Sequence, residues 1–119
     1  MTMLLLLATL AGRPGFAERA IDDASRMLPC VVYDVRADTE DLKIVLFYDG
    51  AGQRACARGA LAVTAPGSRV VFLCPRFQRQ TPELRAAVIV HEVLHSKGLK
   101  EDRHHSISIT EEVFRRCGR

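Results

Sequence analysis

Three stretches of the chain carry the apolar spacing or the capping residues expected of helices. Over residues 18–28, apolar side chains recur at helical spacing and predict a short amphipathic helix, which a proline ends. Residues 81–97 begin with a threonine N-cap and a proline, and a glycine suited to the C′ position follows them. A Ser-x-x-Glu capping box starts a last predicted helix over residues 108–117.

Four shorter stretches have the residue pattern of β-strands. Residues 31–35 and 42–48 are rich in β-branched and aromatic side chains and predict two strands separated by a polar segment. Residues 59–64 and 69–74 flank an Ala-Pro-Gly-Ser turn and predict a β-hairpin. The whole pattern predicts a small α+β domain in which a short antiparallel sheet packs on the central helix, with a further helix at the C-terminus.

The predicted central helix is apolar all round except at three positions. His91, Glu92 and His95 are the polar residues between positions 86 and 95. A helix that is apolar on every side is a buried helix. Burying a carboxylate and two imidazoles costs several kcal/mol unless the groups are paired or bind a metal. The alternative is a surface helix with solvated histidines, which the apolar surroundings disfavour.

His91 and His95 have the spacing of two metal ligands on one helix face. Residues four apart lie one above the other, so both imidazoles can reach a common point. Zinc accepts such nitrogens at about 2.0–2.1 Å. Glu92 then lies beside the metal, where its carboxylate can serve as general base toward a zinc-activated water. This His-Glu-x-x-His pattern is among the more specific short motifs.

A catalytic zinc site needs a third protein ligand and one open position. Gly98 allows the chain to turn back after the helix, and three residues later Glu101 is the expected third ligand. The neighbouring candidates are Asp102, His104 and His105. Because all four histidines of the chain lie between positions 91 and 105, the metal site is expected around this segment.

Residues 91–101 resemble the zincin metallopeptidases, whose extended motif is His-Glu-x-x-His-x-x-Gly-x-x-ligand. The last position is usually His and sometimes Asp, and here it is Glu101. Over residues 55–117 the chain also looks like a group of short, exported bacterial proteins with His-Glu-x-Leu-His-x-Leu-Gly-Leu-Gly-Glu-Asn-Pro-Pro near the C-terminus. The matching residues are Ala55-Cys56, Gly59 to Ala62, Thr64 to Val71, Cys74, Ile109-Thr110 and Arg116-Cys117. The resemblance implies a zincin-like fold, peptide-bond hydrolysis, and substrate binding along the edge of the strand over residues 69–74.

The chain departs from these patterns at several positions. Lys97 replaces a leucine of the bacterial group, and residues 102–105 replace its Asn-Pro-Pro and the following residue. No methionine follows the motif, so a Met-turn of the metzincin type is excluded. Thermolysin-like enzymes take their third ligand, a glutamate, from a separate helix, which here would be Glu111 or Glu112. The candidates for stabilising an oxyanion are Tyr33, Tyr48, Arg103 and His104.

The N-terminus is typical of an export signal. An apolar stretch over residues 3–12 precedes the small residues Gly15 and Ala17, which predicts cleavage after Ala17 and one mature domain over residues 18–119. No lysine or arginine precedes the stretch, and a buried N-terminal helix is the alternative. Because the stretch is too short to span a bilayer, we expect an exported protein, secreted or periplasmic, without stable membrane insertion.

Four cysteines lie in the predicted mature part. An even count in a small exported domain favours two disulfides. The favoured pairing is Cys74–Cys117, which flanks the helical region, together with Cys30–Cys56. No Cys-x-x-Cys spacing is present, which disfavours a zinc ribbon.

These observations favour a zinc-dependent metallopeptidase acting on peptide or protein substrates. Zinc would be held by His91, His95 and Glu101, with Glu92 as the catalytic base. The net charge of +3 is mild and the aromatic side chains are few, which disfavours nucleic acid as a partner. The alternatives are a secreted binding module stabilised by zinc without turnover, or one stabilised by its disulfides alone. The sequence does not indicate the oligomeric state.

Overall fold

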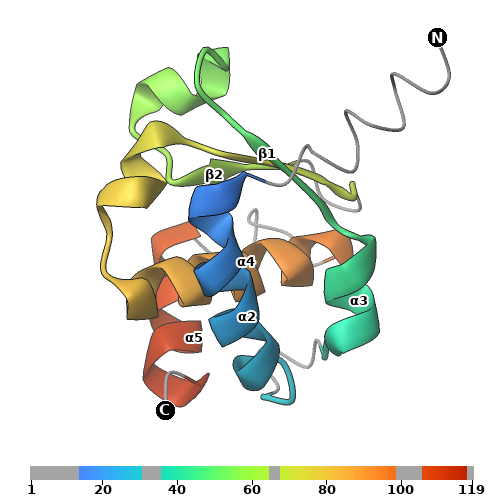
Figure 1. Ribbon diagram of the computed structural model, residues 1–119. Coiled ribbons are helices and arrows are strands. Elements are labelled where there is room, and N and C mark those ends of the chain that lie inside the picture. The colour runs from blue at the N-terminus through green and yellow to red at the C-terminus, as the bar shows by residue number, and fades with distance from the viewer. Residues whose placement is uncertain (1–13, 31–35, 65–67, 99–105, 118–119) are drawn as a thin grey trace, which may run out of the picture.

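The computed structural model describes residues 14–30, 36–64, 68–98 and 106–117. They form a small α+β domain around the predicted central helix, α4 (Pro82–Ser96) (Figure 1). The remaining helices and short 3-10 helices are η1 (Gly15–Ala17), α2 (Glu18–Met27), α3 (Thr39–Ile44), η2 (Arg54–Arg58), η3 (Pro75–Arg79) and α5 (Ser106–Cys117). The strands are β1 (Leu46–Asp49), β2 (Ala62–Val63) and β3 (Val70–Leu73).

Helix α4 has the caps and the burial that its sequence predicts. The Thr81 hydroxyl accepts a hydrogen bond from the Leu84 backbone N–H at 3.2 Å, and Pro82 is the first helical residue. After the helix, Gly98 has a φ of 102°, which favours glycine. Every residue from position 86 to position 95 is buried. The middle of α4 is therefore enclosed by the rest of the domain.

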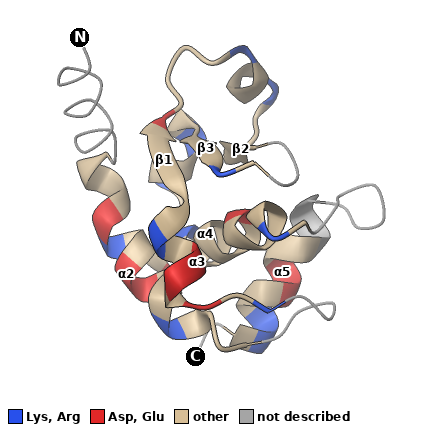
Figure 2. Ribbon diagram, turned by 90° about the vertical axis from the view of Figure 1, so that its right-hand side faces the viewer, with Lys and Arg blue, Asp and Glu red and all other residues tan. Residues whose placement is uncertain are grey.

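Helices α2 and α5 pack against α4, and the sheet lies on its other side (Figures 1 and 2). The stripe predicted for α2 is confirmed, because Ile21 and Ala24 are buried in the common core. Helix α5 buries Ile109 and Val113 in the same core. The side chains that α2 and α5 direct inward thus fix their positions relative to α4.

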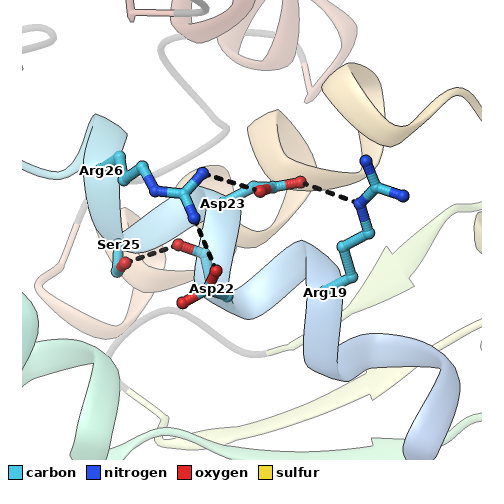
Figure 3. A network of polar contacts seen from close by, with 5 residues as sticks. All are labelled: Arg19, Asp22, Asp23, Ser25 and Arg26. Carbon is cyan, nitrogen blue, oxygen red and sulfur yellow. Dashed lines mark hydrogen bonds and ion pairs between the residues drawn. The ribbon is translucent and has the colours of Figure 1, made fainter.

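The outward face of α2 carries charged side chains that pair with one another (Figure 3). Arg26 hydrogen-bonds to Asp22 at 2.7 Å and to Asp23 at 3.2 Å, and Arg19 lies 3.9 Å from Asp23. Exposed pairs of this kind contribute little to stability. Acidic and basic residues are mixed along α2 in Figure 2, so this face is a solvated helix surface.

The sheet is mixed, whereas the sequence predicted an antiparallel one. Strand β3 is central: it pairs with β2 antiparallel and with β1 parallel. The predicted hairpin between residues 59–64 and 69–74 is therefore confirmed, in a shorter form. The parallel pair arises because the long connection after β1 carries β2 to the far side of β3.

The strand predicted over residues 42–48 is wrong in its first half. Residues Thr39–Ile44 form helix α3, because Asp38 and Asp41 make a reciprocal capping box. The Asp38 carboxylate accepts hydrogen bonds that lower its pKa, and the bond from the Asp41 backbone N–H has the largest effect. The strand begins only at Leu46. The strand predicted over residues 31–35 lies outside the described residues.

Two disulfides are present, and the predicted pairing is wrong. Cys30 is joined to Cys117, with Cα atoms 5.7 Å apart, and Cys56 is joined to Cys74, with Cα atoms 5.4 Å apart. The first pair forms because α2 and α5 both pack on α4 and finish at the same end of the domain (Figure 1). The second forms because the chain around Leu61 runs beside Cys74, whose N–H donates to the Leu61 carbonyl at 2.9 Å.

The described residues begin at Pro14, so the apolar stretch of the predicted signal lies outside them. Phe16 and Ala17 pack against the core, and the Phe16 ring lies 6.2 Å from that of Phe77. Cleavage after Ala17 stays a prediction. Within the described part of the chain, no helix has the length and apolar character needed to cross a membrane. The two disulfides are compatible with an extracellular location.

Candidate metal centre

His91, Glu92 and His95 lie in the second half of α4 and are almost completely buried. Their exposed fractions are 1%, 4% and 3%. The Nε2 atoms of His91 and His95 are 2.8 Å apart, and the two rings are tilted by 50° with centroids 4.6 Å apart. The predicted pair of imidazoles therefore directs its ring nitrogens at a common point.

A cleft of about 530 Å³ opens beside these three residues. Leu84 and Val88 line it from α4, together with Thr110 and Glu111 from α5. The opposite wall is the segment over residues 58–64, which includes β2. Apart from Arg58 and Thr64, the side chains of this wall are apolar. The site is thus a mostly apolar cleft with the histidine pair and Glu92 on one side.

The wall opposite α4 is held by covalent and polar contacts. The Cys56–Cys74 disulfide ties η2 to the end of β3. The Arg76 guanidinium donates to the Gly59 carbonyl at 3.1 Å. Gly59 itself has a φ of 83°, which favours glycine at this turn. These contacts tie the cleft wall to the end of β3 and to η3.

Thr110 joins the site from α5 and was missed as a site residue by sequence reasoning. Its Oγ1 lies 2.7 Å from Nδ1 of His91, and the contact is buried. A metal-ligating histidine commonly uses its second ring nitrogen in this way. The sequence signals were its place at the start of the last predicted helix and its match, with Ile109, to the group of short bacterial proteins. Neither indicates which helix face would meet His91.

The two imidazoles fit a zinc ion. Nitrogens bound tetrahedrally at zinc distances lie about 3.3 Å apart. The observed 2.8 Å separation is about half an ångström shorter, so the two nitrogens would move apart by that amount on binding zinc. Imidazole nitrogen is also a donor that zinc prefers. His91 and His95 are the residues that would hold it.

Among the described residues, no group of three His, Cys, Asp or Glu side chains is placed to hold a metal ion. Glu101 and its neighbours Asp102, His104 and His105 all lie outside them. Glu111 lines the cleft, whereas Glu112 does not. Glu112 hydrogen-bonds to Arg115 at 2.7 and 2.8 Å, and these bonds lower its pKa.

The fold changes two further expectations, the substrate-binding edge at residues 69–74 and Tyr48 as a candidate for stabilising an oxyanion. The strand over residues 69–74 cannot offer a free edge, because β3 is paired on both sides. Within the described chain, β2 is the edge strand that lines the cleft. Tyr48 contacts Phe72 at a ring distance of 5.9 Å and does not line the cleft. Tyr33, Arg103 and His104 lie outside the described residues.

Comparison with known proteins adds no family to this picture. No family model matches the chain, and no curated protein or solved structure shows significant similarity to it.

Proposed function

We propose that this protein is an exported zinc-dependent hydrolase, a small zincin-like metallopeptidase. The observation that carries the proposal is the convergence of His91 and His95, with Glu92 between them, on the wall of a cleft. Burying three such groups together in an apolar helix is costly unless they serve a common site. A metal held by the two imidazoles accounts for all three. The two disulfides support export to an oxidising compartment.

The chain's own groups divide the reaction between them. His91 and His95 would hold zinc, with Glu101 as the proposed third ligand. Zinc, when bound, supplies an acidified water and polarises the substrate carbonyl. Glu92 takes the proton from the attacking water and passes it to the leaving amine. The buried surroundings of Glu92 exclude bulk water from this transfer.

The shape of the cleft suits an extended peptide. Strand β2 pairs on one side with β3, and its other edge can add a peptide strand through backbone hydrogen bonds. Val88 and Leu84 lie one and two helical turns before His91 and line the same cleft. They provide an apolar surface for a substrate side chain next to the metal.

Metal content tests the proposal directly. The wild-type protein, purified without added metal or chelator and measured by mass spectrometry, should carry about one zinc per chain. His91→Ala should lose it because His95 and the proposed ligand Glu101 alone make a weak site. Ser96→Ala is the matched control: it alters the same helix next to His95 but removes only a hydroxyl bonded to the Val93 carbonyl.

The remaining outcomes separate the alternatives. Zinc retained in the wild type without cleavage of any peptide in a broad set of internally quenched substrates would select a zinc-stabilised binding module. No zinc even after reconstitution would overturn the proposal and select a module stabilised by disulfides.

A further inference from the structure

Thr110 makes a buried contact with the histidine pair from a different helix. Its side chain is 9% exposed, and its Oγ1 lies 2.7 Å from His91 Nδ1. The contact joins two residues 19 positions apart, so it depends on the packing of α5 against α4. On the other side of the same ring, Nε2 points to His95. Thr110 and the candidate metal position therefore lie at opposite ends of the His91 imidazole.

We propose that Thr110 is a positioning residue of the metal centre, which accepts a hydrogen bond from His91 Nδ1–H and so keeps the Nε2 lone pair directed at the metal. A neutral imidazole carries one ring proton, on Nδ1 or on Nε2. Only the form protonated on Nδ1 leaves Nε2 free to bind zinc. An acceptor placed at Nδ1 stabilises that form and fixes the ring orientation.

The position of Thr110 is fixed by the packing of α5. Ile109 and Val113, before and after it on α5, are completely buried. The Cys30–Cys117 disulfide fixes the end of the same helix. The β-branched threonine side chain also has few rotamers in a helix. Because the hydroxyl is fixed in this way, its hydrogen bond favours one orientation of the His91 ring in the metal-free protein.

The inference rests on the proposed zinc site, and zinc affinity of the full-length protein tests it. The zinc dissociation constant is measured by competition with a chromophoric chelator. Thr110→Val removes the hydroxyl at nearly constant shape and should weaken zinc binding about 10- to 100-fold, the usual effect of losing such a partner. Thr110→Ser keeps the hydroxyl and should restore the affinity to within about threefold of wild type.

Thr64→Val is the matched control for this substitution. Thr64 lies on the opposite wall of the cleft, and its hydroxyl donates to the Val70 carbonyl at 2.6 Å. Losing this hydroxyl should leave zinc affinity unchanged, because the bond that it makes to the Val70 carbonyl holds β3 and not a ring nitrogen of the histidine pair. Equal affinities in wild type and Thr110→Val would overturn the role of Thr110 and leave the zinc site standing. A wild type that binds no zinc would overturn both.

A spectroscopic signature separates positioning from general destabilisation. In the zinc-loaded wild type, NMR should show a slowly exchanging Nδ1–H proton on His91 with a close contact to Thr110. The same signal should persist in Thr110→Ser and exchange rapidly in Thr110→Val. If the valine variant fails to fold, the wild-type spectrum still tests the hydrogen bond between His91 and Thr110. Absence of the protected Nδ1–H proton in that spectrum would contradict the bond.

Discussion

Glu92→Gln should reduce peptide hydrolysis at least 100-fold while the zinc content stays at about one per chain. The amide has nearly the same shape as the carboxylate, so the buried wall of the cleft is kept. It cannot accept the proton of the attacking water, and general base catalysis contributes about 10²–10⁴ to the rate. The measurement is kcat/KM on an internally quenched peptide, with zinc content determined on the same preparation.

Glu83→Gln is the control for this variant. Glu83 stands in the first turn of the same helix, is exposed and does not line the cleft, so its substitution should leave both kcat/KM and zinc content near wild type. Full activity of Glu92→Gln would refute the base role of Glu92. Simultaneous loss of zinc would show that Glu92 helps to hold the metal rather than to move a proton.

The part of the site that lies on α4 is predictable from sequence for local reasons. The threonine cap, the following proline and the final glycine fix where the helix starts and ends. Once residues 86–95 are helical, the separation of four residues places His91 and His95 on one face. The observed burial of both histidines also follows from the apolar residues around them. No knowledge of distant contacts is needed for these conclusions.

The part that depends on packing between distant segments is not predictable in this way. The Thr110 contact requires the rotation of α5 about its axis, and periodicity alone does not say which polar residue will meet His91. Lys97 shows the same limit: its ammonium lies 3.2 Å from Asp41, a residue of α3 that is 56 positions away. Lys97, which replaces a leucine of the bacterial group, thus pairs with an acidic residue of α3.

Two further errors, the strand over residues 42–44 and the cysteine pairing, have different causes. Residues 42–44 have side chains compatible with a strand, but the Asp38 capping box stabilises a helical turn there instead. The cysteine pairing instead depends on which chain ends meet, and four cysteines allow three pairings that sequence does not distinguish. A correct choice required knowing that α2 and α5 finish at the same end of the domain and that η2 lies beside the end of β3.

Removing the Cys30–Cys117 disulfide should cost the domain about 4–5 kcal/mol of unfolding free energy. The bond closes a loop with a sequence separation of 87 residues, and the loss of loop entropy in the unfolded chain grows with that length. This is a large part of the roughly 5–15 kcal/mol that stabilises an ordinary domain. The double variant Cys30→Ala/Cys117→Ala, followed by urea unfolding under non-reducing conditions, measures it.

The Cys56→Ala/Cys74→Ala variant is the natural comparison, because its bond closes a loop with a separation of only 18 residues and should cost about 3 kcal/mol. Its effect on substrate binding should be the larger of the two. This bond holds the wall that faces α4 across the cleft, so its loss should raise KM more than it lowers kcat. The Cys30–Cys117 bond instead anchors α5, so its loss should weaken zinc binding through Thr110. Equal effects of both variants on stability and on KM would contradict this division between the two disulfides.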